Sequence, residues 1–269
     1  MNLVSVIIPT YNRSELLSRA IKSVLTQSYS DYELIVVDDC SMDDTKDVVA
    51  GFNNKRIRYI RLGKNSGGSM IPRQAGLEIS KGKYIASLDD GDFWIDKYKL
   101  SLQVLYLEGH PECVMVGTDA IIFNGDGSVR THLHYPKTYI EIKNKLLMQQ
   151  CFLHSSVMYR KEALLDVGGY STYEGGYYMN YTDEYATWLR MGLVGELVNL
   201  PIYGVGYVFP QQRNPGMKDR ICFMIRHIKL MSKYKKYYPN YLRANIYSLV
   251  ITMFVLPLLP MIRKVTRKY

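Results

Sequence analysis

The apolar positions in the first third of the chain follow two spacings in turn. Apolar residues that are continuous, or that alternate with polar ones, predict strands at residues 4–9, 33–39, 57–62 and 83–90. Between the first two strands, apolar residues recur every three or four positions from Leu16 to Leu25, which predicts an amphipathic helix. Strands that alternate with helices through short links predict an α/β fold, with a Rossmann-like, mostly parallel central sheet flanked by helices.

Polar side chains stand at the carboxyl ends of three of these strands. They are Thr10-Tyr11-Asn12, Asp38-Asp39 and Asp89-Asp90. Ligands of parallel α/β sheets bind beyond the carboxyl ends of the strands. We therefore expect the three groups to converge on one crevice.

The second half of the sequence is less regular. Strands are expected at 114–117, 120–123 and 155–160, and helices at 138–148 and 183–192. The run Asn124-Gly125-Asp126-Gly127 is typical of a turn. Because neither a repeat nor a linker interrupts the pattern, residues 1–215 are predicted to form one domain, followed by a tail at 216–269.

Charge is distributed unevenly between the domain and the tail. The 269 residues have a net charge of +9. Residues 218–269 contain twelve Lys or Arg and one acid, hence +11, whereas the rest contains 22 basic and 24 acidic residues, hence −2. A block of one sign usually marks an interaction segment, and a basic block suits nucleic acid or anionic lipid.

Apolar residues within the tail favour lipid over nucleic acid. Five of them can share one face of a predicted helix: Ile221, Met224, Ile225, Ile228 and Met231. Basic residues on the other faces make this the pattern of an amphipathic helix on an anionic membrane surface. A helix packed on its own domain has the same pattern, and this alternative stays open. No nucleic-acid partner is expected, because the tail is too apolar for a solvated phosphate groove and has no binding motif.

A second apolar stretch, at residues 246–262, is 17 residues long and is flanked by basic residues. This length is at the lower edge for crossing a bilayer, and Pro257 and Pro260 would break a helix near its end. The chain opens directly as a strand, so no cleavable signal peptide is expected. We expect peripheral or shallowly inserted association with the cytoplasmic face of the cell membrane.

The acidic strand ends suit one of three enzyme classes that use such sheets. A dinucleotide-dependent oxidoreductase needs GxGxxG after the first strand, but the sequence there is PTYNR. The phosphate-binding pattern GxxxxGK[ST] is also absent from the sequence. The remaining class binds a nucleoside diphosphate through a metal, and the oxygens of Asp89, Asp90 and Asp92 suit Mg²⁺ or Mn²⁺. The alternative, a solvated acidic turn, stays open.

Several motifs, taken in order, resemble the family 2 glycosyltransferases of bacterial surface-glycan type, which have the GT-A fold. The motifs are VSVIIPTYNR, ELIVVDDCSMDDT, NSGGSMIPRQAGLEISKGKYIASLDDGDFW, HSSVMYRKEALLDVGGY and DEYATWLR. The resemblance spans residues 3 to 210. It implies a GT-A fold for the domain, with the basic and apolar helices of the tail following it.

The resemblance implies a nucleotide site at the strand ends. Pro9 and Tyr11 would line the base pocket, with Tyr11 stacking on the base. Asp39 would accept a hydrogen bond from the N3–H group of uracil or thymine. Arg73 would lie near the donor, although Gln74 replaces the usual Asn beside it, and Asp89 would reach the ribose and the diphosphate.

The resemblance also implies a bound Mn²⁺ or Mg²⁺. The usual motif is L-D-x-D-D-x-W, whose middle Asp commonly ligates the metal. Aligned on Leu88 and Trp94, that position is Gly91 in this sequence. We therefore expect Asp90 or Asp92 to ligate the metal, with Asp90 favoured. The alternative, that Asp89 and Asp90 hold it together, stays open.

On the acceptor side, Asp183 and Glu184 are similar to the family's catalytic Glu-Asp pair. Glu184 would be the general base, one methylene longer than the usual Asp, and a base must come within hydrogen-bond distance of the acceptor hydroxyl. His154 is expected to line the acceptor side. The alternative, that the two acids merely favour the start of a helix, stays open.

The resemblance implies an enzyme, an inverting glycosyltransferase of the hexosyltransferase class. It would move one sugar from a UDP- or dTDP-linked donor to a hydroxyl of a lipid-linked or surface glycan acceptor, with the metal stabilising the diphosphate leaving group. The processive signature QxxRW is absent from the sequence, so single-sugar addition is expected. One alternative remains, a catalytically impaired sugar-nucleotide-binding scaffold or regulatory protein, suggested by Gly91 and Glu184. A nucleotidyltransferase would need a basic Gly-rich loop after the first strand, and the sequence has none there.

Overall fold

A computed structural model describes residues 3–170, 180–208 and 217–250, without the side chains of 180–183, 217–220 and 223. The chain divides into two compact units. The first comprises Met1–Ile142 and Cys151–Pro210, and the second comprises Lys143–Gln150 and Gln211–Tyr269.

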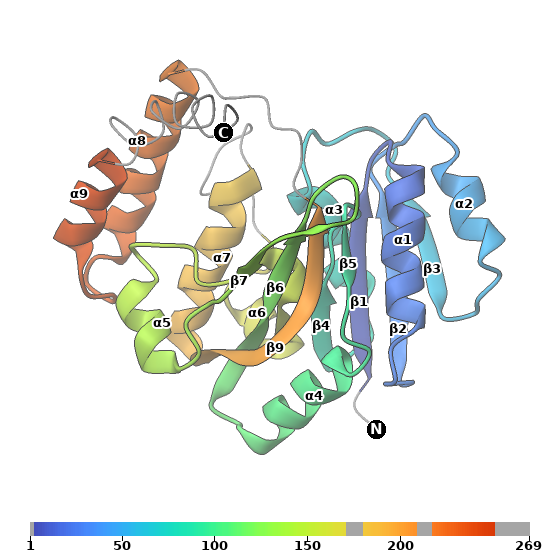
Figure 1. The fold of residues 1–269 in the computed structure, drawn as a ribbon, viewed down its shortest axis with the longest axis horizontal. Helices are drawn as coiled ribbons and strands as arrows, with labels where there is room; N and C mark the ends of the chain where they lie inside the picture. The colour runs from blue at the N-terminus through green and yellow to red at the C-terminus, as the bar shows by residue number, and fades with distance from the viewer. Residues whose placement is uncertain (1–2, 171–179, 209–216, 251–269) are drawn as a thin grey trace. The chain divides into compact units, whose positions relative to one another are not determined.

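The strands described in the first unit form one mixed sheet (Figure 1). In chain order they are β1 Val4–Thr10, β2 Tyr32–Asp38, β3 Ile57–Arg61, β4 Tyr84–Ser87, β5 Asp92–Trp94, β6 Cys113–Phe123, β7 Val129–Leu133, β8 Met158–Arg160 and β9 Glu196–Val208. Their order across the sheet is β3-β2-β1-β4-β8-β6-β9-β5, with β7 paired to β6. The first four strands in this order are parallel, and β8 joins them antiparallel to β4.

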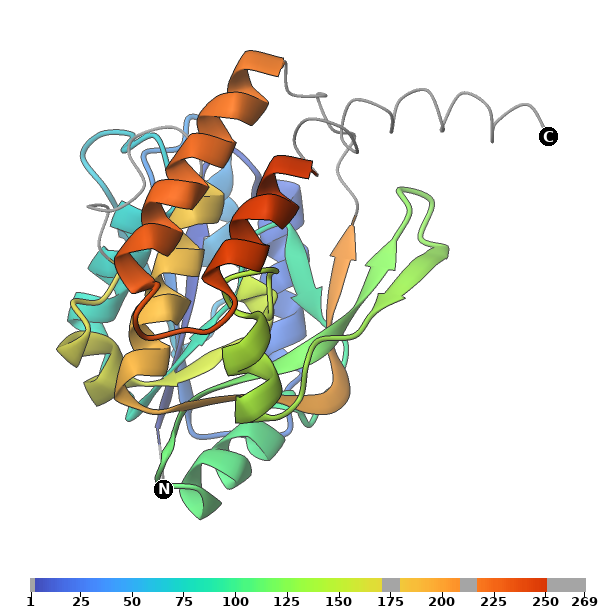
Figure 2. The ribbon, with the colours of Figure 1, turned by 90° about the vertical axis from the view of Figure 1, so that its left-hand side faces the viewer.

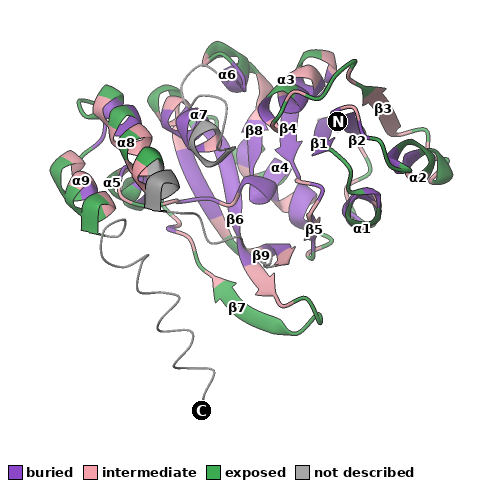
Figure 3. Cartoon of the chain, turned by 90° about the horizontal axis from the view of Figure 1, so that it is seen from above, coloured by how far each residue is buried: buried purple, intermediate pink, exposed green. Residues whose placement is uncertain are grey.

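Helices cover both faces of this sheet (Figure 3). They are α1 Ser14–Leu25, α2 Thr45–Gly51, α3 Met70–Ile79, α4 Lys99–Gly109, α6 Lys161–Asp166 and α7 Asn180–Val194. The helix α5 Tyr139–Lys145 spans the boundary between the two units. Along β1, Val6 and Ile8 belong to the core that includes the buried faces of α1 and α4. Ile7 points the other way and would lie 2.7 Å from a Cβ on Gly76 of α3. Because β1 is buried on both faces, each of its side chains is either apolar or hydrogen-bonded. This burial explains the nearly continuous apolar run in the sequence.

The structure confirms the predicted strands of the first half, but the expected break between strands 114–117 and 120–123 is wrong. Those residues form one strand, β6. The polar pair Thr118-Asp119 lies at the expected break, but both side chains are buried with partners. The Thr118 hydroxyl donates to the Asp119 carbonyl oxygen at 3.0 Å. A satisfied polar pair can lie inside a buried strand.

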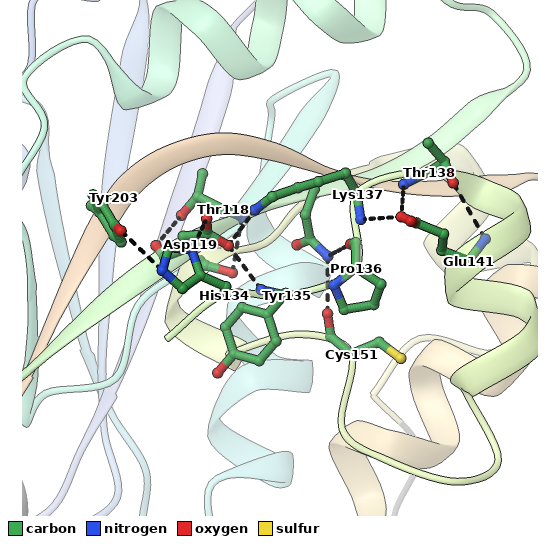
Figure 4. A network of polar contacts seen from close by, with 12 residues as sticks. Thr118, Asp119, His134, Tyr135, Pro136, Lys137, Thr138, Glu141, Cys151 and Tyr203 are labelled. Carbon is green, nitrogen blue, oxygen red and sulfur yellow. Dashed lines mark hydrogen bonds and ion pairs between the residues drawn. The ribbon is translucent and has the colours of Figure 1, made fainter. Parts of the chain in front are cut away.

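Asp119 is the centre of a polar network that ties the segment after β7 to β6 and β9 (Figure 4). Its carboxylate accepts from the Tyr135 amide at 2.9 Å and from the Lys137 ammonium group. His134 Nδ1 lies 3.3 Å from the same carboxylate, and His134 Nε2 lies 3.2 Å from the Tyr203 hydroxyl. The network therefore joins three segments that are far apart in the sequence.

Asn199 on β9 extends this anchoring to the loop that begins at Cys151. Its side-chain amide donates to the carbonyl oxygens of Pro136 at 2.8 Å and Cys151 at 2.9 Å. A Cβ on Gly117 would lie 2.2 Å from Asn199 Oδ1, so this close approach requires glycine. Asn199 thereby fixes the start of the segment that carries His154 and Ser155.

The expected strand at 155–160 is correct only from Met158 onward, where β8 begins. His154–Ser156 instead form a single 3₁₀ turn, η1. The Ser156 hydroxyl donates to the Leu153 carbonyl oxygen at 2.7 Å. Serine side chains that bind nearby backbone favour turns over strands, and this competition is the physical reason for the difference.

The second unit contains α8 Met217–Tyr234 and α9 Tyr241–Val250, which lie side by side (Figure 2). The predicted amphipathic segment falls on α8, where Met231 is buried and Ile225 is exposed. Among the described helices, none combines the length and apolar character needed to span a membrane. Residues 251–269, which hold most of the second apolar stretch, lie outside the described residues.

Candidate active site

The carboxyl ends of β1, β2 and β4 lie side by side, as hydrogen bonds between their residues show. The Asp39 amide donates to the Thr10 carbonyl oxygen at 2.9 Å, and the Thr10 hydroxyl donates to the Asp90 carboxylate at 3.0 Å. Pro9 is buried in β1, whereas Tyr11 is exposed just beyond it. Thr10 therefore connects the two acidic strand ends, with an exposed aromatic ring next to it.

Asp39 is a buried carboxylate that holds the Gly-rich segment before α3. It accepts from the Ser66 amide at 2.9 Å, from the Ser66 hydroxyl at 2.9 Å and from the Asn65 side chain at 3.1 Å. Burial raises the pKa of Asp39, and the hydrogen bonds from Ser66 only partly oppose this. The end of β2 thus presents a shielded acceptor group.

Asp89 and Asp90 each pair with an arginine. The Arg73 guanidinium donates to Asp89 at 2.6 Å, and Arg13 donates to Asp90 at 3.2 Å. Burial favours the neutral form of Asp89, but the charge and hydrogen bond of Arg73, together with the groups of His154 and Arg13, outweigh it and lower the pKa of that carboxyl. Burial raises the pKa of Asp90 in spite of Arg13. The side chain of Asp89 is 35% exposed, so it also faces solvent.

Asp92, the third acid of this stretch, is connected to Asp89 through Ser155. It is buried, and its carboxylate accepts from the Ser155 hydroxyl at 2.5 Å. The same hydroxyl accepts from the Asp89 amide at 3.0 Å. Burial, followed by the charge of Asp89, raises the pKa of Asp92 well above its ordinary value. Ser155 therefore couples η1 to the strand end that carries the acids.

Arg73 on α3 also binds Glu184 on α7. Its second terminal nitrogen lies 2.8 Å from Glu184 Oε1. Burial favours the neutral form of Arg73, but the charges of Asp89 and Glu184 outweigh it and raise its pKa. One buried guanidinium thus joins a carboxylate that follows β4 to a carboxylate on α7.

His154 places an unpaired ring nitrogen beside the same carboxylate. The residue is 3% exposed, and its Nδ1 has no hydrogen-bond partner in the described structure. That nitrogen lies 3.9 Å from Glu184 Oε1. Burial, followed by the charge of Arg73, lowers the pKa of His154 to about 3, so the imidazole is neutral at pH 7. Asp183 precedes Glu184 on α7, and its side chain lies outside the described residues.

The structure adds two site residues that were not singled out from the sequence, Arg13 and Ser155, beside Thr10, which was expected at the strand ends. Thr10 and Arg13 bind Asp90, and Ser155 binds Asp92. Arg13 could have been identified from the sequence, because it is a cation in the first link between strand and helix. Ser155 could not have been identified in this way, because its segment has the pattern of a strand. The bridge from Arg73 to Glu184 was also not predicted.

The carboxylates fit a divalent cation that takes part of its shell from a nucleotide. Within the described ranges, no three carboxylate, imidazole or thiol groups gather into a preformed cage. Mg²⁺ is usually held by one or two carboxylates plus substrate phosphates rather than by such a cage. Asp89 and Asp90 offer hard oxygen donors of this kind, with Asp89 partly exposed.

Comparison with protein families gives one match. The sequence model of the family described as "Glycosyl transferase family 2" matches residues 5–168. The chain is 45% identical over 94 residues to the putative colanic acid biosynthesis glycosyl transferase WcaA of Escherichia coli K12, covering 34% of this chain and 33% of WcaA. It is 38% identical over 108 residues to the Escherichia coli protein WfaP, named UDP-Glc:alpha-D-GlcNAc-diphosphoundecaprenol beta-1,3-glucosyltransferase, covering 40% of this chain and 42% of WfaP. The matches thus span less than half of either relative.

Solved structures share the fold over nearly the whole chain. Residues 1–349 of Staphylococcus aureus TarS in complex with UDP-GlcNAc superpose with a TM-score of 0.68 at 17% identity, covering 94% of this chain and 73% of that chain. The mannosyltransferase PcManGT of Pyrobaculum calidifontis, in complex with GDP-Man and Mn²⁺, superposes with a TM-score of 0.65 at 17% identity, covering 94% and 70%. These likenesses confirm the predicted GT-A fold.

Proposed function

The chain belongs to glycosyl transferase family 2, and on that premise we propose that it is an inverting glycosyltransferase. It moves one sugar from a UDP- or dTDP-linked donor to a hydroxyl of a lipid-linked or surface glycan. The observation that carries this proposal is the buried Arg73, which binds Asp89 and Glu184 at once. WfaP, whose name specifies a lipid-linked acceptor and a UDP-linked donor, supports both substrate classes.

On the donor side, the strand ends bind the nucleotide. Tyr11 is exposed beyond β1 and stacks on the base, with Pro9 behind it. Asp39 accepts the N3–H of uracil or thymine, and its hydrogen bonds from Ser66 orient the carboxylate. Asp89, fixed by Arg73, reaches the ribose and the diphosphate.

Asp90 is the proposed holder of Mn²⁺ or Mg²⁺, with Asp92 as the second candidate of the same stretch. Asp90 lies at the crevice, where Thr10 orients its carboxylate. Asp92 is hydrogen-bonded to Ser155, and this contact helps to position the acidic stretch Asp89–Asp92. The bound cation would neutralise charge on the departing diphosphate as a Lewis acid.

On the acceptor side, Glu184 takes the proton of the attacking hydroxyl. Arg73 occupies Oε1 of Glu184 and holds the carboxylate in one orientation. The unpaired Nδ1 of the neutral His154 binds a hydroxyl of the acceptor beside it. Asp183 is proposed to assist Glu184.

We expect Asp39→Ala and Asp90→Ala each to abolish nucleotide-sugar turnover without unfolding the protein. The first removes the acceptor for the base, and the second removes an oxygen donor for the cation. The measurement is release of nucleoside diphosphate from a panel of UDP- and dTDP-sugars with Mn²⁺, together with thermal melting. Asp47→Ala, at an exposed position of α2, is the matched control. Full activity in either site variant with normal melting would refute the assignment, whereas a wild type that binds nucleotide without turnover would favour the scaffold alternative.

We also propose that the second unit binds the anionic cytoplasmic face of the membrane. Leu242, Ile246 and Leu249 are exposed and recur at helical spacing along α9. Lys235 and Lys236, in the turn before α9, are exposed as well. An apolar stripe with neighbouring basic residues is the arrangement of helices that lie in the membrane interface. The surface would keep the enzyme near a lipid-linked acceptor.

The double variant Leu242→Glu, Ile246→Glu is expected to reduce binding to vesicles that contain anionic lipid by at least about tenfold, because two apolar contacts are replaced by repelled charges. Co-sedimentation of the full-length protein with such vesicles measures this. Leu105→Glu on α4 is the control, since Leu105 is 71% exposed and Leu242 is 75% exposed. Equal binding of the wild type and the double variant would exclude α9 as the membrane surface.

A further inference from the structure

Arg13 is a cation of the crevice to which the proposed function assigns no role. It directly precedes α1, as the N-cap residue of that helix. Its side chain is 58% exposed, and one terminal nitrogen contacts Asp90 at 3.2 Å. The guanidinium therefore contacts the acidic stretch, while more than half of the side chain is exposed.

The space beside Gly91 is open to this guanidinium. A Cβ on Gly91 would lie 3.7 Å from Arg13 Nη1, an ordinary contact distance. Arg19 lies on the other side, where it donates to the Gly91 carbonyl oxygen at 2.8 Å and packs 4.4 Å from the centre of the Phe93 ring. Arg19 is thus engaged by backbone and ring, whereas Arg13 contacts Asp90 and is more than half exposed. An acidic residue at position 91 would lie against Arg13 and bind it.

We propose that Arg13 binds the diphosphate of the nucleotide donor, and that Asp90 holds the guanidinium in place before the donor arrives. The inference rests on the proposed function, since it concerns the same donor site. A guanidinium offers five donors in a planar fork that matches phosphate oxygens. The amino end of the 12-residue helix α1 adds positive potential at the same point. Glycine at position 91 keeps Arg13 available, because no second carboxylate competes for it.

The test is calorimetric titration of the full chain with UDP and dTDP, once with Mn²⁺ and once with EDTA. We expect Arg13→Gln to weaken binding of the preferred nucleotide by roughly tenfold or more in both buffers, since it removes a charge-assisted contact to phosphate. Affinity for the matching nucleoside, which lacks phosphate, should not change. Lys22→Gln removes one positive charge from the exposed side of the same helix and should leave both affinities as in the wild type. Thermal melting of Arg13→Gln should match the wild type, because the ion pair is largely exposed.

A second variant tests the role of Gly91 independently. Gly91→Asp places a carboxylate beside Arg13 and should weaken nucleoside diphosphate binding in EDTA by severalfold, because the guanidinium is then shared.

The outcomes separate this inference from the proposed function. Equal diphosphate affinity of Arg13→Gln and wild type overturns the inference, and so does an equal loss of diphosphate and nucleoside affinity, which would show a structural role. If no nucleoside diphosphate binds the wild type, the proposed function itself fails, and the inference fails with it.

Discussion

Replacement of Glu184 by Gln lowers kcat by about 10²–10⁴-fold, the contribution that a positioned general base makes to proton transfer. The substitution keeps the size of the side chain and an oxygen that can accept from Arg73. It removes the capacity to take a proton from the acceptor hydroxyl, and it also removes one of the two negative charges that surround Arg73. Because the donor is proposed to bind on the Asp89 side of the bridge, KM for the nucleotide sugar should remain close to that of the wild type.

Steady-state transfer assays with donor and acceptor varied in turn measure this effect. Glu78→Gln is the matched control, since Glu78 is an exposed glutamate on α3, the helix that carries Arg73. A kcat within twofold of the wild type in Glu184→Gln would remove Glu184 as the base. A change confined to donor KM would place Glu184 in the nucleotide site instead.

Replacement of Arg73 by Ala is expected to lower the free energy of unfolding by about 3–5 kcal/mol, as when one partner of a buried ion pair is removed. Two carboxylates, Asp89 and Glu184, lose their shared cation. Because 35% of the Asp89 side chain is exposed, water compensates part of the loss, and the lower end of this range applies. The free energy of unfolding of Arg73→Lys should lie between that of the wild type and that of Arg73→Ala, because one ammonium group cannot reproduce the fork that reaches both carboxylates.

The loss should depend on pH in a defined direction. Arg73 lowers the pKa of Asp89 below its unfolded value of about 3.9, so this stabilisation is fully present above that pH. It is lost as the pH falls through the lower folded pKa. The difference between wild type and Arg73→Ala, measured by urea unfolding, is therefore largest at neutral pH and shrinks below about pH 4.

Arg58→Ala provides the comparison. Arg58 pairs with Glu33 at 3.0 Å, but its side chain is partly exposed, so removal should cost about 1 kcal/mol or less. A loss in Arg73→Ala no greater than that in Arg58→Ala, or one that stays constant down to pH 3, would contradict the assigned role of the buried bridge.

The sequence alone was sufficient for the parallel half of the fold. The runs that became β1 and β2 are local signals, because a buried strand must be apolar at nearly every position, as Val6, Ile7 and Ile8 show. The half-buried β3 was signalled by its alternation of apolar and polar residues. The polar strand ends followed from the rule for parallel sheets, and Thr10 does bind Asp90 across them.

The second half was less predictable because its polar residues are satisfied by distant partners. Thr118-Asp119 lies inside β6 because the segment after β7 supplies hydrogen bonds to it. Ser155 lies in a turn and binds Asp92, although its segment has the pattern of a strand. No window of local sequence contains both members of these pairs.

What the sequence by itself determined is therefore the layered sheet and the acids at its edge, since both follow from local periodicity and from strand direction. The tertiary structure alone decided which charges meet. Arg73 could be assigned to the donor by resemblance, but its contact with Glu184 exists only because α3 and α7 bring the two side chains within 2.8 Å. The physical reason is that a buried charge is stable only with partners at contact distance, and the fold, not the spacing along the chain, supplies them.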